Sequence, residues 1–295
     1  MIDFSQDPTV TEALRQWRGR NVFPTDFSAE DLRGLSRQLR ERAVLSARTT
    51  NAEYLAEVQE IVDQMLGGKI GLAEGRFQLM RKLRQLGYDP EKGFPQDMAD
   101  VPPAEKGSLR DLSSEQRIDL MLETNQRMAL NYGRMAAGNG EYARYAYPAW
   151  ELVRLYLRAV PRGERRNEEG ALVPDPRNAW PTRWQAAGES VGWEGAIAEP
   201  MIALKDSPLW PALGEGVGGY RDTLDNPYPP FAFRSGMAWR AVPRAECVTL
   251  GLIEEGEASG PMKGTLSPGQ KEVNHAFTRL PAELQAVLRK ELLNA

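Results

Sequence analysis

The chain has 295 residues and a formal net charge of −4, with 41% hydrophobic and 26% charged residues. This balance is ordinary for a soluble globular protein, and the length suits one large domain or two smaller ones. The acidic balance argues against a general nucleic-acid binder, which needs a basic face. One cysteine, Cys247, excludes an internal disulfide framework, and with one histidine, His275, it predicts neither a metal nor a cofactor.

Two features bear on location. The N-terminus, MIDFSQDPTV, lacks the charged and apolar regions of a signal peptide. No apolar run approaches the roughly 18 residues that a membrane span requires. We therefore expect a protein that is made in a cytoplasm and stays soluble there, with no membrane partner.

Apolar residues recur at intervals of three and four along the first 87 residues, which predicts amphipathic helices that fold back on one another. Ser28 opens a helix whose apolar stripe runs to Ala43, and Asn51 caps the next. Gly67-Gly68 and Gly87 mark helix ends.

Residues 88–112 are rich in proline and predict a polar linker. A capping-box pattern at Ser113 then opens a long helix. Thr124 and Asn125 fall in the middle of this helix, where we expect them to hydrogen-bond to a packed loop. A catalytic role for Asn125 is the less favoured interpretation.

Beyond Gly140 the pattern changes to short strands, short helices and loops. Alternation of apolar and polar residues predicts a strand over residues 153–159, and the segments MIAL and GMAWRAV predict two more. Ser207-Pro208 and Pro243 begin short helices, and Asp206 reads as a helix cap. Residues 161–200 read as a loop.

The predicted fold is therefore α+β, a helical N-terminal region followed by a compact mixed domain and a short helical tail. We expect three parts: residues 1–112 as the helical region with its linker, 113–252 as the α+β domain, and 253–295 as a mobile loop with C-terminal helices.

The segment Pro227–Val242, PYPPFAFRSGMAWRAV, carries the most information, and we call it the ribbon. Pro229 and Pro230 each fix φ and remove a backbone donor, so neither a helix nor a central strand runs through them. Its aromatic side chains bring more apolar area than a solvated loop needs. The ribbon plugs a groove in its own domain or presents a stiff surface to a partner; we favour the plug, which would bury Tyr228, Phe231, Phe233 and Trp239.

Two short motifs suggest enzymes. Gly188-Glu189-Ser190-Val191-Gly192 matches the nucleophile elbow of α/β-hydrolases, with His275 downstream as the base. Gly214, Gly216 and Gly219 match the dinucleotide fingerprint. Neither motif has the strand before it and the helix after it that its chemistry requires, so both are disfavoured. Arginine outnumbers lysine by 29 to 8, which suits multidentate bonds to carboxylates and carbonyls and keeps an arginine-patch nucleic-acid-binding module as an alternative.

Taken in order, the chain resembles the phage Mu F-like minor head proteins, also called phage head morphogenesis proteins, over roughly residues 10–250. The helical lead-in ALRQWRGRNVFPTDF, the segment ERAVLSARTTNAEYLAEVQEIVDQML and the strand WELVRLYLRAV fall where the family has them. LMLETNQRMALNYGR resembles its signature helix, and SPLW, with Trp210, and NPYPPFAFRSGMAW resemble parts of its C-terminal domain. The signature positions here are Thr124, Asn125, Arg127, Tyr132, Gly133 and Arg134.

The chain departs from the family in one respect. Typical members carry an Asp-x-Arg-Thr-Arg-Pro segment, a nearby histidine and a Cys-Arg-Cys after the ribbon. Here Arg158-Ala159-Val160-Pro161-Arg162 and Met237-Ala238-Trp239-Arg240 stand in those places. The resemblance is therefore to a divergent branch, in which we expect apolar packing by a tryptophan-rich insert to replace any cross-link.

The resemblance implies a non-enzymatic structural protein that acts in head assembly. Its expected partners are the portal protein and the major capsid protein. Its expected locations are the bacterial host cytoplasm during assembly and then the virion head. Contact with phage DNA is left open by the resemblance, but the net acidity gives it no support.

Overall fold

The computed structural model describes residues 7–35, 37–95, 103–156 and 160–256. The fold is mixed α+β, as predicted, with about 45% helix and 14% strand. The chain divides between Gly133 and Arg134 into two compact units, here called the N-terminal unit and the C-terminal unit. The expected boundary after residue 112 differs from this division, which falls inside helix α6 (Glu115–Gly138).

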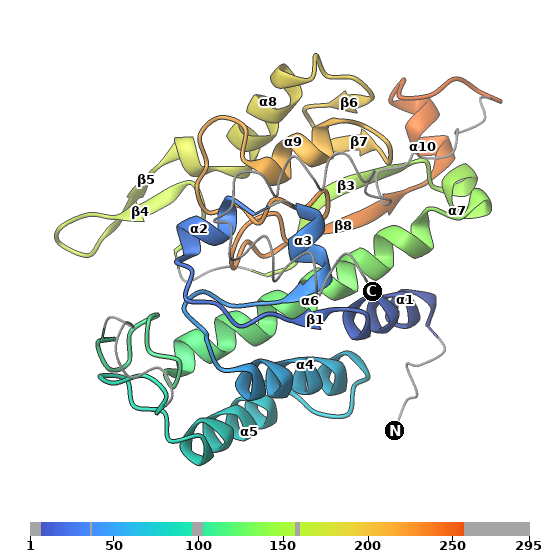
Figure 1. Ribbon diagram of the computed structural model, residues 1–295. Helices are drawn as coiled ribbons and strands as arrows, with labels where there is room; N and C mark the ends of the chain where they lie inside the picture. The colour runs from blue at the N-terminus through green and yellow to red at the C-terminus, as the bar shows by residue number, and fades with distance from the viewer. Residues whose placement is uncertain (1–6, 36, 96–102, 157–159, 257–295) are drawn as a thin grey trace. The chain divides into compact units, whose positions relative to one another are not determined.

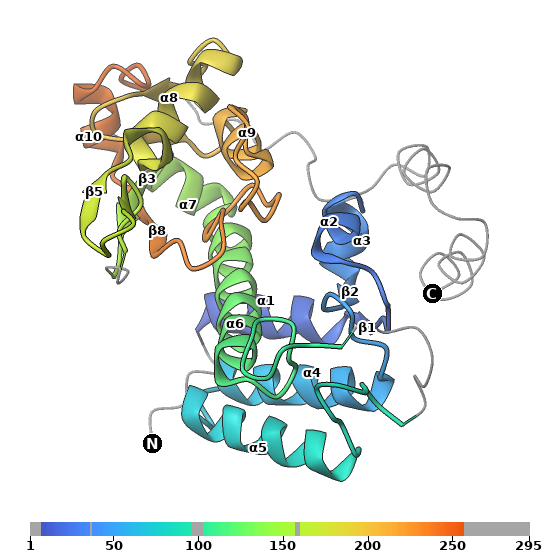
Figure 2. The same ribbon diagram turned by 90° about the vertical axis from the view of Figure 1, so that its left-hand side faces the viewer.

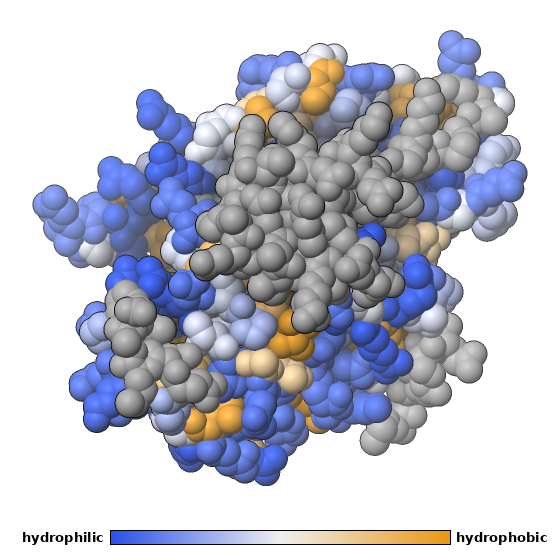
Figure 3. Space-filling model, in the orientation of Figure 1, coloured by the Kyte–Doolittle hydropathy of each residue, from blue (hydrophilic) through white to orange (hydrophobic). Residues whose placement is uncertain are grey.

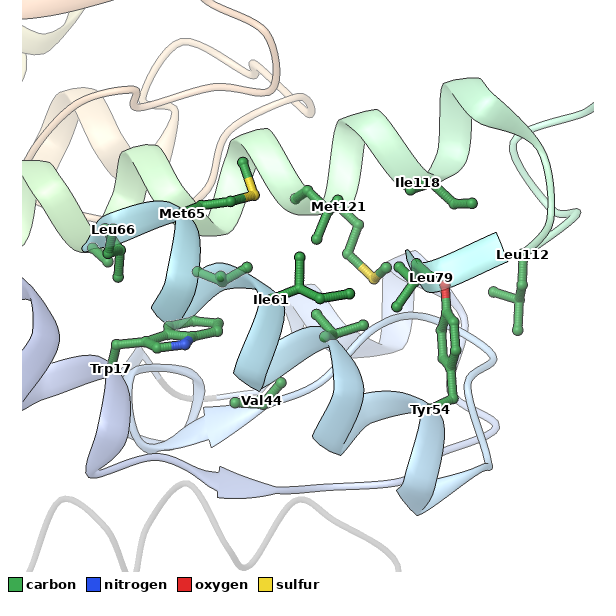
Figure 4. Packing of buried hydrophobic residues seen from close by; sticks show 14 of the residues in the cluster. Trp17, Val44, Tyr54, Ile61, Met65, Leu66, Leu79, Leu112, Ile118 and Met121 are labelled. Atoms are coloured by element: carbon green, nitrogen blue, oxygen red, sulfur yellow. The ribbon is translucent and has the colours of Figure 1, made fainter. Parts of the chain in front are cut away.

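The N-terminal unit is built from amphipathic helices around one apolar core. Helices α4 (Ala52–Leu66) and α5 (Leu72–Gln85) lie side by side in both views (Figures 1 and 2). Helix α1 (Pro8–Arg18) packs on α4, and α6 supplies a further set of core residues. Figure 4 shows how these helices bring their apolar side chains together; the labelled residues include Trp17, Tyr54, Ile61, Met65, Leu79, Ile118 and Met121.

Helix ends in this unit follow the sequence signals. The Asn51 side chain accepts a hydrogen bond from the Tyr54 amide at 2.9 Å, as expected for the cap of α4. Gly67 ends α4, and Gly87 has φ = 71° just beyond α5, which suits a residue without a Cβ. The predicted cap of α6 at Ser113 is wrong: Ser114 accepts from the amide of the third residue after it, while the Ser113 hydroxyl donates to Asp111.

The single helix predicted from Ser28 to Ala43 is also wrong. The structure has two short helices, α2 (Ala29–Arg33) and α3 (Arg37–Arg42), because Gly34 caps the end of α2. Ser28 and Asp31 form the reciprocal capping box that opens α2. Strands β1 (Asn21–Val22) and β2 (Ala43–Val44) pair in parallel beside them, over a small apolar cluster that contains Phe23, Leu35, Leu39 and Ala43.

The C-terminal unit contains a four-stranded antiparallel sheet with the strand order β6-β7-β3-β8. Its strands are β3 (Ala149–Arg154), β6 (Ala196–Ile197), β7 (Ile202–Leu204) and β8 (Met237–Val242). The expected strands at 201–204 and 236–242 are confirmed. The strand predicted over 153–159 begins earlier, because pairing with β8 runs from Ala149 to Arg154; Leu155 is 68% exposed, and residues 157–159 lie outside the described residues.

Residues 161–200 are not the loop that their prolines suggested. They form a hairpin of β4 (Glu164–Arg166) and β5 (Leu172–Pro174), followed by helix α8 (Trp180–Ser190). Pro181 lies in the first turn of α8, where a proline displaces no helical hydrogen bond. Ala179 caps the helix without a side-chain hydrogen bond, so the helix start has no capping side chain.

A 3₁₀ helix (Pro176–Asn178) and three short α-helices complete the described part of the C-terminal unit. Helix α9 (Leu209–Glu215) packs against α8, as Figure 2 shows, and begins where Ser207-Pro208 predicted it. Helix α10 (Arg244–Thr249) follows Pro243 as expected. Helix α7 (Glu141–Ala146) connects α6 to the sheet. The predicted C-terminal helices, including His275, lie outside the described residues.

Candidate interaction site

The ribbon is held in one non-helical conformation by hydrogen bonds to its own neighbourhood. The Pro229–Pro230 peptide bond is cis, and Phe231 has a positive φ of 52°. The Leu224 amide donates to the Phe231 carbonyl at 2.8 Å, and the Ser235 hydroxyl donates back to the Pro230 carbonyl. These bonds close the ribbon into a turn that ends at strand β8.

The ribbon packs into a cluster of aromatic rings. The Trp210 ring on α9 is stacked on Phe231 at 5.9 Å between centroids, and it forms T-shaped pairs with Trp239 at 5.2 Å and Trp184 at 5.3 Å. The Trp210 indole N–H donates to the Leu204 carbonyl at 2.9 Å. The structure thus brings together three of the residues singled out by sequence, Trp210, Phe231 and Trp239, and adds Trp184 from the missed helix α8. We call these four residues, with Trp150, the aromatic cluster.

Burial tests the plug interpretation of the ribbon. Tyr228 and Phe231 are fully buried and Trp239 is almost so, which confirms the expectation for these three residues; Pro229 and Pro230 are buried as well. The expectation for Phe233 is wrong, because its side chain is 42% exposed. The backbone of Phe233 bonds to Asp222 and Arg162 at a turn, while its side chain faces solvent. The ribbon is therefore mainly an internal element of its own unit.

Asp206 does not cap helix α9, contrary to the expectation. Pro208 is the N-cap residue, and the Ser207 hydroxyl accepts from the Leu209 amide. The Asp206 carboxylate instead accepts a hydrogen bond from Arg144 at 3.0 Å, and the Arg144 side chain is only 4% exposed. The aspartate compensates a buried charge on α7.

Lys205, next to Asp206, is a buried lysine that sequence reasoning missed. Its ammonium donates to the carbonyls of Gly138 at 2.8 Å and Ala143 at 3.1 Å and lies 4.4 Å from the centre of the Trp150 ring. Burial, and then the charge of Arg144, lower the pKa of Lys205 to about 8. These bonds tie the carboxyl end of α6 to strand β7 within the C-terminal unit.

The signature positions on α6 are divided between the two units. Thr124, Asn125 and Arg127 are half-buried in the N-terminal unit, while Arg134 is the first residue of the C-terminal unit. The Asn125 amide donates to the Met121 carbonyl of its own helix at 2.9 Å, so the expected bond to a packed loop is wrong. Arg127 lies 3.6 Å from the Glu123 carboxylate one turn earlier.

A second missed feature is an arginine–aspartate cluster. Arg162 and Arg183 both form ion pairs with Asp222, and Arg183 Nη1 lies 2.8 Å from the carboxylate. Burial opposes ionisation of Asp222, but the hydrogen bonds and charges of Arg183 and Arg162 outweigh it, so the pKa of Asp222 is lowered. The high arginine content is a signal of such bonding, but it does not say which arginines converge.

The two enzyme motifs lack their required surroundings. Ser190 is the last residue of helix α8, and its hydroxyl donates to the Ala187 carbonyl at 2.7 Å. Gly214 lies in the last turn of helix α9, Gly216 and Gly219 follow that helix, and the next helix in the described chain begins only at Arg244. Within the described ranges, no group of three or more His, Cys, Asp or Glu side chains could hold a metal ion. None of the helices that the structure describes has the length and apolar character needed to cross a membrane.

Helix α7 carries a group of exposed tyrosines. Tyr142 is 82% exposed, Tyr145 is 54% exposed, and Tyr147 just beyond the helix is 43% exposed. The Arg244 guanidinium lies 4.4 Å from the centre of the Tyr145 ring and donates to the Tyr145 carbonyl. Figure 3 shows a mainly hydrophilic described surface with small, separate hydrophobic patches on the face in view. Residues 142–147 thus expose three tyrosine side chains within six positions.

Comparison with family models, with curated proteins and with solved structures finds no match for this chain.

Proposed function

We propose that this protein is a non-enzymatic minor head protein of a phage or prophage, which acts in head assembly through contacts with the portal protein and the major capsid protein. It would act in the bacterial cytoplasm during assembly and stay in the virion head. The proposal starts from the sequence resemblance carried by the signature helix and the ribbon. The structural observation that favours a binding role is the group of exposed tyrosines on α7.

These tyrosines suit a protein–protein contact. Tyrosine supplies a large, rigid contact area with a polar end, and it is enriched in interfaces. Tyr142 and Tyr145 lie three residues apart on α7, so their rings share one side of the helix. Because the ribbon is mostly buried, it leaves this helix as the stronger candidate for the contact surface.

Two side chains with nucleophilic potential, Cys247 and Ser190, lie in arrangements that favour a structural role for these residues. Cys247 is buried, and burial raises the pKa of its thiol to about 11, which keeps it protonated and unreactive at neutral pH. Ser190 donates its hydroxyl hydrogen to a carbonyl of its own helix. Both arrangements are those of structural residues.

The test is co-expression with the portal and major capsid proteins encoded in the same locus, followed by size-exclusion chromatography. We expect a shared peak with one of them. Tyr142→Ser combined with Tyr145→Ser should abolish or strongly reduce it, while Phe77→Ser, which removes an exposed aromatic ring from the N-terminal unit, should not.

Separate elution of the wild-type protein at several salt concentrations would contradict the proposed function. A shared peak that survives the double tyrosine substitution would keep the function but exclude α7 as the contact surface.

A further inference from the structure

Helix α5 lies at the outer edge of the N-terminal unit, as Figures 1 and 2 show, and one side of it faces solvent. Four exposed side chains form a row along this side: Glu74, Phe77, Arg81 and Arg84. Phe77 is 60% exposed, although a phenylalanine ring gains most when it leaves water. We call these four residues the α5 row.

The spacing of the α5 row is that of a coiled-coil seam. Its members follow one another at steps of three, four and three residues, so they lie on one side of the helix. The helix does not use this side for its own core, because Leu79 and Leu83 on the inner side are buried against α4 and α6. The α5 row is therefore a second seam, which solvent covers.

The charges of the α5 row are not matched within the N-terminal unit. The side chains of Arg81 and Arg84 have no hydrogen bond or ion pair with any residue that the structure describes. By contrast, Arg76 and Lys82, on other sides of the same helix, form ion pairs with residues of α6 and α4. The Glu74 carboxylate accepts a hydrogen bond within its own helix but has no cationic partner there. The row thus presents both signs of charge to an outside partner.

The α5 row is complementary to a second copy of itself that runs antiparallel. In a pair of helices centred at Leu79, residues equally far before and after that position face each other. Glu74 then faces Arg84 of the second copy, and Phe77 faces Arg81 of the second copy. Two-fold symmetry repeats both contacts. An acidic group meets a basic one, and a guanidinium meets an aromatic ring.

The parallel arrangement lacks this match. There each residue would face its own copy, which sets glutamate against glutamate and arginine against arginine at three of the four positions. Like charges that face each other at close range repel. The order of residues along the α5 row therefore selects the antiparallel arrangement.

We propose that the α5 row is a self-association surface, on which a second copy of this chain docks with its own α5 antiparallel. Two Glu74–Arg84 ion pairs and two Phe77–Arg81 cation–π contacts hold the copies together. The surface is separate from the tyrosines of α7, so this proposal and the proposed function can fail independently.

The size of the contact sets its strength. Helix α5 has 14 residues, which is about 21 Å, and the α5 row contains one large apolar side chain. Contacts of this size belong with transient complexes, which bury less than about 1,200 Å² in total. Exposed ion pairs are also screened by salt. We therefore expect a weak dimer that dissociates as the ionic strength rises.

The test is sedimentation equilibrium of the full-length protein at low ionic strength and at concentrations up to about 0.5 mM, where a weak dimer is populated. We expect a monomer–dimer equilibrium that shifts to monomer in about 0.5 M salt. Phe77→Ala should weaken dimerisation about tenfold, because it removes both cation–π contacts. Leu109→Ala is the control, since it truncates another exposed apolar side chain of the N-terminal unit.

Reversal of the charges tests the register. Glu74→Arg and Arg84→Glu each set like charges against each other twice, so each alone should abolish the dimer. The two substitutions combined in one chain oppose acid to base again and should restore it. Glu60→Arg on α4 is the matched control, because Glu60 is exposed and accepts from a glutamine one turn later at 2.9 Å, as Glu74 does.

Circular dichroism shows whether each variant is folded. If a charge-reversed variant does not fold, the comparison of Phe77→Ala with Leu109→Ala decides alone. Three results would each overturn the proposal: a wild-type protein that stays monomeric at every concentration, single reversals that dimerise as well as the wild type, or a folded double variant that stays monomeric.

Discussion

Trp150 and Trp239 stack face to face across neighbouring strands, with ring centroids 5.1 Å apart and ring planes within 1° of parallel. In the β3–β8 register Trp239 is opposite Leu152, so Trp150 is its diagonal neighbour on the same face of the sheet. Trp239 also meets Trp210 and Phe231, and it thereby connects the sheet to the ribbon. This pair is the junction on which the aromatic cluster depends.

We expect Trp239→Ala to destabilise the C-terminal unit by about 3–5 kcal/mol, because it leaves a large cavity where three aromatic rings meet Trp239. Urea unfolding followed by tryptophan fluorescence measures this, since six of the seven tryptophans lie at or after residue 150. The control is Phe233→Ala at the exposed ribbon position, which should cost less than about 1 kcal/mol. Similar losses of stability for both variants would argue against a special role for the aromatic cluster.

Two glycines of α6 should resist replacement by alanine. A Cβ at Gly133 would lie 2.0 Å from the Thr9 carbonyl oxygen, and one at Gly138 would lie 2.7 Å from the Trp150 ring. Glycine to alanine inside a helix normally stabilises by up to about 1 kcal/mol, whereas this overlap should destabilise by about 1–3 kcal/mol.

The usual gain in helix stability and the steric overlap change the free energy of unfolding in opposite directions, so the sign of the measured change decides between them. Gly140→Ala is the control, because the nearest atom to its Cβ is 3.8 Å away and its φ is −57°. Thermal unfolding of the three single variants measures the effect. Stabilisation by Gly133→Ala or Gly138→Ala would show that α6 does not approach its neighbours so closely.

The arginine–aspartate cluster predicts an acid-sensitive contribution to stability. The pKa of Asp222 is lowered in the folded protein from an ordinary value of 3.8. Below pH 3.8 the unfolded chain therefore takes up the proton first, so the stabilisation is complete above that pH and is lost as the pH falls through the folded pKa. Asp222→Asn should lower the stability at pH 7 and reduce the loss of stability as the pH falls below 3.8.

The measurement is urea unfolding of the wild-type protein and the variant at several pH values. Glu164→Gln removes an exposed carboxylate from strand β4, two residues after Arg162, and serves as the control. A pH profile of Asp222→Asn that runs parallel to the wild-type profile would contradict the assignment.

The hydrolase alternative gives a prediction of its own. Because the Ser190 hydroxyl is bonded to a carbonyl at the end of a helix, we expect no hydrolysis of p-nitrophenyl esters above the buffer rate, and the same result for Ser190→Ala. Turnover that disappears in Ser190→Ala would establish the enzyme instead.

Nucleic-acid binding that weakens steeply with salt would support the arginine-patch alternative.

Features encoded within a few residues were predictable from the sequence. The Ser28 and Asn51 caps, the glycine helix ends and the starts of α9 and α10 depend on local side-chain and backbone chemistry. The burial of most of the ribbon also followed from its composition, because fixed prolines and large aromatic rings rarely remain solvated together.

Features that depend on long-range contacts were not predictable in the same way. The position of β3 is set by pairing with β8, which lies far along the chain. Asp222 is 60 residues from Arg162 and 39 from Arg183 in sequence, so no local pattern shows that they meet. Helix α8 has no capping side chain, and its proline reads as a loop signal until its place in the first turn is known.

Helix α6 belongs to both folding units, and this constrains how the protein can be divided. Its first part supplies Ile118, Leu122 and Ala129 to the N-terminal core, and its last turn supplies the Gly138 carbonyl that Lys205 binds in the C-terminal unit. A fragment that starts after the proline-rich segment keeps the apolar face of α6 but loses the N-terminal helices against which that face packs. A fragment that starts at Arg134 omits the apolar face. Cutting the chain at the proline-rich segment would therefore split the N-terminal core, and a cut that keeps both cores intact falls inside α6.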